Sequence, residues 1–123
     1  QQKYRISFVY ITHDLATARH FSDRIAIMYA GKVVEIAPSK DLIREPLHPY
    51  AQALIEAIPE PDPQNRFREM RTVPGEPPSL VTPPPGCRFH PRCPIAIPGL
   101  CEVQEPLLRE HRPDHEAACH AAE

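Results

Sequence analysis

The stretch that most constrains the fold is GCRFHPRCPIAIPGLC, residues 86–101, which together with Cys119 contains every cysteine of the chain. The gaps between Cys87, Cys93, Cys101 and Cys119 are five, seven and seventeen residues. Fourteen of the 17 prolines follow Ile58, and each proline fixes φ and removes a backbone hydrogen-bond donor. Long helices and central strands are not expected in such a segment, so four converging thiolates are the candidates for holding it in place.

The composition of the 123 residues allows one modest domain and excludes several classes of function. The net charge of −2 offers no basic surface for nucleic-acid phosphates. No apolar run approaches the ~20 residues that span a bilayer, and the N-terminus, QQKYRISFVYITHD, is too polar for a signal peptide. A cytosolic chain is expected, and its cysteines therefore favour metal or cluster binding over disulfides.

The first 58 residues predict an ordered α/β segment. Residues 4–12, YRISFVYIT, are apolar on both alternating faces, which is typical of a strand buried in a parallel sheet. The pattern then predicts a helix over 14–21, a hairpin of strands 24–29 and 33–37, a short helix capped by Ser39, and an amphipathic helix over 48–58. Because the first strand lacks the parallel neighbours that it needs, the chain is expected to be a fragment of a larger protein.

The second half of the chain predicts less regular structure. Residues 59–86 are expected to form an extended strap, with a turn of helix over 66–70 and polyproline II conformation around the proline runs. A short helix is expected over 105–110, before Pro113.

His13 is the first candidate for chemistry, because it follows the predicted buried strand. Ligands of open parallel sheets bind at the carboxyl ends of the strands, and an imidazole there can donate a hydrogen bond to a phosphate oxygen or an attacking water. A role for His13 in capping the next helix or pairing with Asp14 fits the position as well. A His–Asp metal pair would need more histidines than His20.

Two segments resemble a known family. FVYITHDL and ARHFSDRIAIMYAGKVVEIA are similar to the last core segment of an ABC transporter ATPase, in which the histidine of the H-loop contacts the γ-phosphate of ATP. The run REPLHPYAQALIEAIP, the strap TVPGEPPSL and the cysteine block resemble the C-terminal extension of oligopeptide and dipeptide importer ATPases. The matching residues are Met28, Gly31, Val33, Val34 and Glu35 after the histidine, and His48, Pro49 and Tyr50 in the extension.

The resemblance implies an α/β fragment in which residues 1–46 end the ABC ATPase core and residues 47–123 form the extension. It implies that the intact protein binds ATP with Mg²⁺, that His13 positions the γ-phosphate and the attacking water, and that the protein drives peptide import. It also implies a partner ABC ATPase subunit, identical or different, which the helix around Tyr50 contacts besides packing on the hairpin. Membrane permease subunits would hold the protein at the cytoplasmic face of the membrane.

Several motifs of the intact ATPase are missing from this sequence. The phosphate-binding loop G-x-x-x-x-G-K-[ST], the signature LSGGQ and the Walker B run with its acids are absent. This chain alone is therefore not expected to hydrolyse ATP.

The cysteine spacing favours a cluster over zinc, because zinc sites usually contain a C-x2–4-C pair that none of the gaps provides. Four thiolates on a wrapping loop suit a 4Fe–4S cluster, and the resemblance implies one on Cys87, Cys93, Cys101 and Cys119. Zinc, a substituting histidine and metal-free thiols remain open; the histidines concerned are His90, His115 and His120. A structural staple is favoured over a redox relay, since ligation closes long loops.

Two further interpretations follow from the same residues. Arg88 and Arg92 either offset the charge of the thiolates or face solvent. A different class of function, a stand-alone iron–sulfur or zinc module acting as scaffold or sensor, would also use the cysteines, although the incomplete sheet argues against it.

Overall fold

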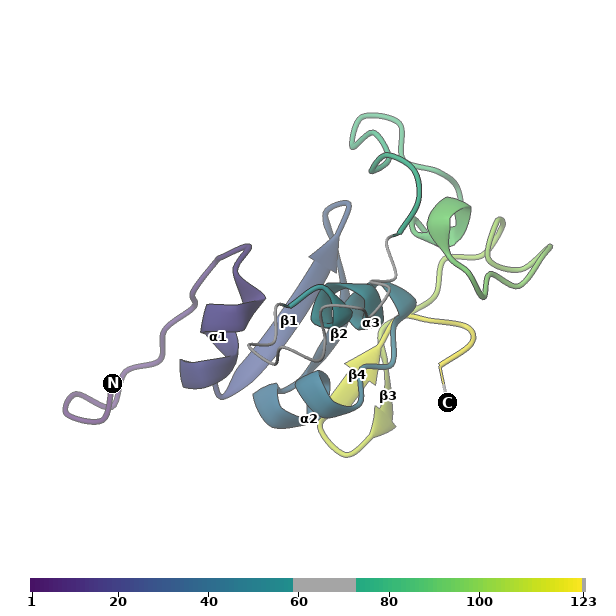
Figure 1. Cartoon of the computed structure of the whole chain (residues 1–123). Helices are drawn as coiled ribbons and strands as arrows, with labels where there is room; N and C mark the ends of the chain where they lie inside the picture. Colours follow the sequence, from purple (N-terminus) through teal and green to yellow (C-terminus); the bar gives the residue numbers. More distant parts are fainter. Residues whose placement is uncertain (59–72, 123) are drawn as a thin grey trace, which may run out of the picture.

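The structure, a computed structural model, describes residues 1–58 and 73–122. In chain order (Figure 1) its elements are α1 (Leu15–Phe21), β1 (Arg24–Tyr29), β2 (Lys32–Pro38), α2 (Ser39–Arg44), α3 (Pro49–Glu56), the 3₁₀ helix η2 (His90–Arg92), β3 (Arg109–Arg112) and β4 (His115–Ala117). The expected turn of helix over 66–70 lies outside the described residues. No helix in the described part is long and apolar enough to cross a membrane.

The strands form one antiparallel sheet in the order β1-β2-β4-β3. The predicted hairpin of β1 and β2 is confirmed, as are the helices that follow it. The hairpin of β3 and β4, residues 109–117 and hereafter the C-terminal hairpin, was not expected. It returns across about 80 residues of sequence to pair β4 with β2, and Figure 1 shows it beside α2. The observed fold is thus a small α/β unit in which the tail completes the sheet.

The core lies on one face of the sheet. Ile25, Ile27 and Tyr29 alternate with exposed residues along β1, as expected for a strand that is covered on one side. Leu42 of α2 and Phe89 of the cysteine segment pack in the same cluster. The proline-rich tail therefore contributes one of the largest buried side chains of the molecule.

A bulge in the hairpin decides which face of β2 is buried. The register steps from Ile27 opposite Glu35 to Met28 opposite Val33, so Val34 is an extra residue on β2. A residue opposite Ile27 shares its face of the sheet. Glu35 consequently enters the core, where its exposed fraction is 0%.

The expected strand over residues 4–12 is wrong for this structure. These residues form no strand and are exposed, including Phe8 at 68% and Ile11 at 93%. A strand with two apolar faces needs partners on both edges, and the described residues include no strand that pairs with it. The segment instead runs away from the sheet as an extended tail (Figure 1).

Two smaller expectations are also wrong. Ser39 is the first residue of α2 and not its cap; Pro38 holds the cap position, and the Ser39 hydroxyl donates to the carbonyl of Arg19 at 3.3 Å. Residues 105–110 form no helix, because their end joins the sheet as β3. Strand pairing with β4 there outweighs the weak local preference for a helix.

Candidate functional site

His13 lies in an exposed segment directly before α1. Asp14, and not His13, caps that helix: its carboxylate accepts a hydrogen bond from the backbone N–H of Thr17 at 3.1 Å. Hydrogen bonds from the side chain and backbone of Thr17 lower the pKa of Asp14. The capping role is thus taken by the neighbour, and the His13 ring remains accessible.

The cysteines lie on separate segments of the tail. Cys87 and Cys93 flank η2, and the backbone N–H of Cys87 donates to the carbonyl of Cys101 at 2.8 Å. The sulfur of Cys101 accepts a hydrogen bond from the N–H of Ile97 at 3.3 Å. Cys119 follows β4, and all four thiols are free. Backbone contacts and the sheet therefore bring cysteines from distant segments into one region.

Gly86 makes the approach of Cys87 to Cys101 possible. Its φ of +68° lies in the left-handed region, and a Cβ there would stand 2.3 Å from the carbonyl oxygen of Cys101. Only glycine provides both the conformation and the space. The close approach of Cys101 therefore requires glycine at position 86, directly before Cys87.

The thiols affect one another electrostatically. Burial raises the pKa of Cys87, Cys93 and Cys119, and the charges of neighbouring cysteines raise each of these pKa values further. Each of these three thiols has an electrostatic interaction with at least one other cysteine, so the four sulfurs lie in one region. In the part of the chain that the structure describes, however, no group of three or more His, Cys, Asp or Glu side chains is arranged to hold a metal ion. The arrangement therefore gives no support to the zinc or 4Fe–4S expectation.

The three histidines considered as substitute ligands have other partners. His90 contacts the carbonyl of Cys87 through Nδ1 at 2.8 Å, and His120 contacts the carbonyl of Gln104 through Nε2 at 2.9 Å. His115 pairs with Glu35 at 2.6 Å and is 2% exposed. Each ring is thus held by a protein oxygen through one of its nitrogens.

The expected His-Pro-Tyr helix is confirmed, and each residue has a distinct role. His48 caps α3, with Nδ1 accepting a hydrogen bond from the N–H of Tyr50 at 3.1 Å, and Pro49 occupies the first turn. Burial lowers the pKa of His48 to about 4. The Tyr50 ring lies 4.6 Å from that of Tyr29 and 5.6 Å from that of Phe89. This motif therefore joins the hairpin to the cysteine segment.

The two arginines of the cysteine segment bind backbone carbonyls and do not simply face solvent. Arg88 donates to the carbonyl of Ala30 in the turn of the first hairpin. Arg92 donates to the carbonyls of Pro74 and Val73 at 2.9 and 3.1 Å, and to the hydroxyl of Tyr29 at 3.3 Å. These bonds fasten the cysteine segment to the sheet and to the strap.

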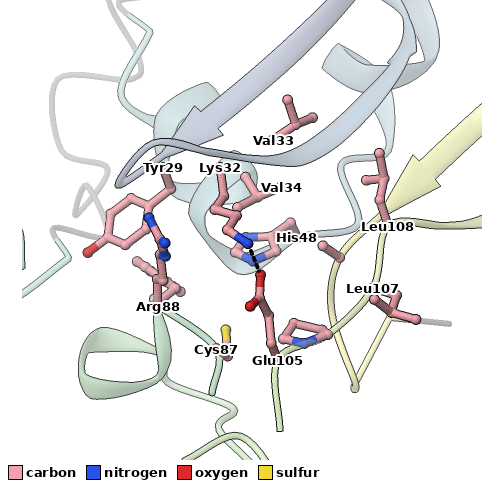
Figure 2. Close-up of a pocket in the computed structure, with 13 residues that line it drawn as sticks. Tyr29, Lys32, Val33, Val34, His48, Cys87, Arg88, Glu105, Leu107 and Leu108 are labelled. Carbon is pink, nitrogen blue, oxygen red and sulfur yellow. Dashed lines mark hydrogen bonds and ion pairs between the residues drawn. The ribbon is translucent and has the colours of Figure 1, made fainter. Parts of the chain in front are cut away.

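A cavity of about 290 Å³ lies between the first hairpin and the cysteine segment (Figure 2). The ring of His48 and the thiol of Cys87 are among the groups that line it, and an ion pair between Lys32 and Glu105 spans it. His48 of the His-Pro-Tyr motif and the first cysteine therefore line the same cavity.

Sequence reasoning missed Glu35, which has the lowest exposed fraction of the buried polar side chains among the described residues. The Glu35 carboxylate accepts hydrogen bonds from the N–H groups of Leu47 and His48 at 2.9 and 2.7 Å, and from Nε2–H of His115 at 2.6 Å. Its signal in the sequence is an acid inside the apolar run VVEIA, since a carboxylate on a buried face needs partners. Without the register of the hairpin, the face of Glu35 could not be assigned.

Fold and site together define a small α/β unit in which a cysteine-bearing tail packs on a β-hairpin. Residues 34–101, more than half of the chain, match the family described as the C-terminal region of the oligopeptide/dipeptide transporter. The chain belongs to this family, and the resemblance inferred from the sequence is confirmed.

Relatives match nearly the whole chain. It is 42% identical over 121 residues to the oligopeptide transport ATP-binding protein AppF of Bacillus subtilis, covering 98% of this chain and 36% of that protein. It is 45% identical over 119 residues to a putative peptide import ATP-binding protein of Brucella ovis, with 97% and 37% covered. A putative oligopeptide transport ATP-binding protein of Bacillus subtilis, YkfD, is 47% identical over 121 residues, with 98% and 36% covered. The chain spans a little over a third of the length of these relatives.

Proposed function

We propose that this chain forms the C-terminal part of the ATP-binding subunit of a peptide importer. Residues 1–46 end the ATPase core and residues 47–123 form the extension. The observation that carries the proposal is the family match over residues 34–101, supported by relatives whose names describe transport ATP-binding proteins. The complete subunit couples ATP binding and hydrolysis to peptide import.

The partners follow from this role. The subunit pairs with a second ABC ATPase subunit, identical or different, and binds membrane permease subunits at the cytoplasmic face of the membrane. ATP and Mg²⁺ bind residues that this sequence does not contain, and His13 reaches that site to hold the γ-phosphate and the attacking water. The exposed position of His13 is compatible with a contact to groups outside this chain.

His13 gives the direct test. In the complete ATP-binding subunit assembled with its permease, His13→Ala should lower ATP hydrolysis about 100-fold, the scale of a positioned proton-transfer or hydrogen-bonding group, while ATP binding is retained. His20→Ala is the matched control, because His20 is also exposed and lies only seven residues further on. Full hydrolysis in the His13 variant would refute the proposed role of this residue.

The four cysteines are proposed to hold a 4Fe–4S cluster as a structural staple. The proposal rests on the type of donor and not on a site already formed: four free thiols lie on separate segments that a shared cofactor would join, and after burial the neighbouring cysteines raise the pKa of Cys87, Cys93 and Cys119. Cysteine thiolates are the ligands of such clusters. A bound cluster would cross-link the tail and stabilise the folded state by closing its loops.

The cofactor is tested by anaerobic purification followed by an absorption spectrum and assays for iron, sulfide and zinc. A brown protein with a broad band near ~400 nm and about four irons per chain is expected, and Cys93→Ser should remove the colour. A colourless protein with stoichiometric zinc, or with no metal, would overturn the cluster and leave the transporter proposal standing on the family match.

A further inference from the structure

The side chain of Glu35 connects three parts of the chain: β2, the segment before α3, and β4. Its carboxylate is fully buried on β2 and accepts hydrogen bonds from two backbone N–H groups that precede α3 and from His115 on β4. A buried carboxylate is costly unless it is fully hydrogen-bonded. The carboxylate therefore favours the arrangement that brings all three donors together over any in which one is missing.

The C-terminal hairpin has few other means of attachment. β4 pairs with β2 at only two positions, Glu35 with Ala117 and Ile36 with Glu116, and one further backbone bond runs from Ala118 to Val34 at 2.8 Å. Such short pairing is weak by itself. The pair of Glu35 and His115 is the buried polar contact that fixes the register of this strand.

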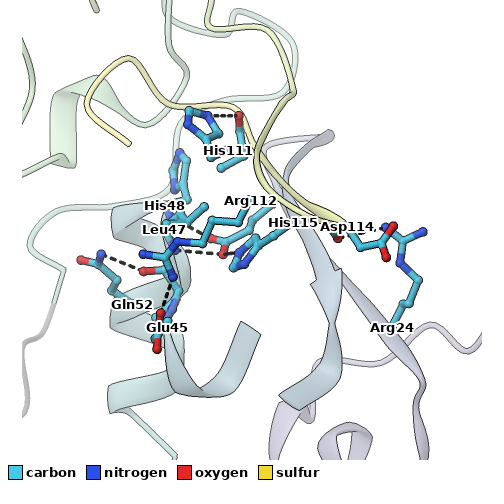
Figure 3. Close-up of polar contacts among 12 residues, drawn as sticks. Arg24, Glu45, Leu47, His48, Gln52, His111, Arg112, Asp114 and His115 are labelled. Atoms are coloured by element: carbon cyan, nitrogen blue, oxygen red, sulfur yellow. Dashed lines mark hydrogen bonds and ion pairs between the residues drawn. The ribbon is translucent and has the colours of Figure 1, made fainter. Parts of the chain in front are cut away.

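The remaining polar side-chain contacts between the hairpin and the rest of the described chain lie at its surface. Arg112 forms an ion pair with Glu45, and the side chains are 42% and 49% exposed. Arg24 reaches the carbonyl of Asp114 at 3.5 Å (Figure 3). Exposed ion pairs contribute little to stability, so these contacts do not replace the buried pair.

Cys119 is carried by the end of this hairpin. It lies four residues after His115, and Ala117 and Ala118 between them are buried. The remaining cysteines are on the segment 87–101, and His120, next to Cys119, contacts the carbonyl of Gln104 just after that segment at 2.9 Å. On its other side, the position of Cys119 depends on how β4 is attached.

We propose that Glu35 and His115 are positioning residues that hold the C-terminal hairpin on β2 and so keep Cys119 beside the other three cysteines. Neither residue is itself a ligand. The expected effect on a bound cluster rests on the proposed function of the cysteines. The expected effect on the position of Cys119 does not, because it rests on the contacts of Glu35. Loss of either partner frees the hairpin and removes the fourth thiol from the site.

Two substitutions weaken the attachment in different ways. Glu35→Gln removes the negative charge that strengthens the bond from His115 and turns an amide NH₂ toward one of the donors, so that this donor loses its acceptor. His115→Phe keeps a ring of similar size and removes only the donor. The control is Glu116→Gln, which makes the same Glu-to-Gln change on β4 at the residue next to His115. The Glu116 side chain forms no hydrogen bond or ion pair among the described residues.

The experiment measures iodoacetamide labelling of each cysteine by mass spectrometry, in the protein as expressed from its own gene and stripped of metal. Both variants should raise the labelling rate of Cys119 about tenfold or more, as for a locally opened segment, with changes under about twofold at Cys87 and Cys93. Glu116→Gln should match the wild type. Unchanged labelling of Cys119 in both variants, or an equal rise at all four cysteines in both, would overturn the proposal.

The same samples separate this inference from the cofactor proposal. If the wild type purified anaerobically contains iron and sulfide, both variants should lose the absorption band near ~400 nm together with the iron, and its retention in both would contradict a positioning role. If the wild type contains none, the cluster proposal fails, while selective labelling of Cys119 still supports the role of Glu35 and His115.

Discussion

Acidification is expected to destabilise the chain through His48. The ring is 1% exposed, and burial lowers its pKa from 6.5 to about 4. In the neutral ring, Nδ1 accepts the hydrogen bond from Tyr50 that caps α3, so the proton of the ring resides on Nε2. Protonation would place a charge in this buried position and remove the acceptor of the cap.

The sign and size follow from linkage. The unfolded chain binds the proton near pH 6.5 and the folded chain only near pH 4, so stability rises with pH between these values. Above pH 6.5 His48 imposes no penalty. As the pH falls through this window the loss approaches about 3 kcal/mol, because each unit of pKa difference corresponds to about 1.4 kcal/mol, and it does not increase further below the folded pKa.

Urea denaturation followed by circular dichroism, at about pH 7.5 and about pH 4.5, measures this loss. His48→Asn is the reference variant, because asparagine still accepts a hydrogen bond at a helix cap but does not titrate. Other acidic and basic groups contribute to both proteins and cancel in the difference. The wild type should lose about 2 to 3 kcal/mol more than His48→Asn, and equal losses would refute the assignment of a buried neutral His48.

Two further substitutions test the packing of the cysteine segment. Phe89→Ala removes a ring that is 1% exposed and should lower the free energy of unfolding by about 3–5 kcal/mol in urea titrations; a loss below about 1 kcal/mol would mean that the segment does not pack on the core. Gly86→Ala should destabilise the chain more than Gly99→Ala in the same assay, because both have positive φ but only a Cβ at position 86 would meet the backbone of Cys101. Equal losses would show that the close approach to Cys101 is not required.

The first hairpin and α3 could be predicted because their signals are local. Alternating apolar residues, the turn at Gly31 and the proline after His48 specify these elements within a few residues. The strand expected over residues 4–12 depended on partners, and apolar character alone does not supply them. Without a pairing strand, the backbone N–H and C=O groups of an extended apolar segment have only water as hydrogen-bond partner.

The C-terminal hairpin could not be predicted from its own residues. The run REHRPDHEA contains five charged residues and two histidines and has no alternating apolar pattern, so nothing local distinguishes it from a loop. Its place in the sheet depends on β2, far away in the sequence, and on one carboxylate with donors in both β4 and the segment before α3. Long-range pairing of this kind leaves no periodicity for sequence reasoning to detect.

Two sequence features resemble the family: the residues from Met28 to Glu35 and the His-Pro-Tyr motif. The position of Glu35 gives a physical reason why both occur on one chain. The start of a helix leaves backbone N–H groups without partners, and a carboxylate near that end is favourable because of the helix dipole. Glu35 lies on β2, 13 residues before His48, and accepts the N–H of Leu47 and of His48, while the His48 side chain accepts the next free N–H of α3. The acid of one motif thus completes the helix start of the other, and a change at either should disturb both.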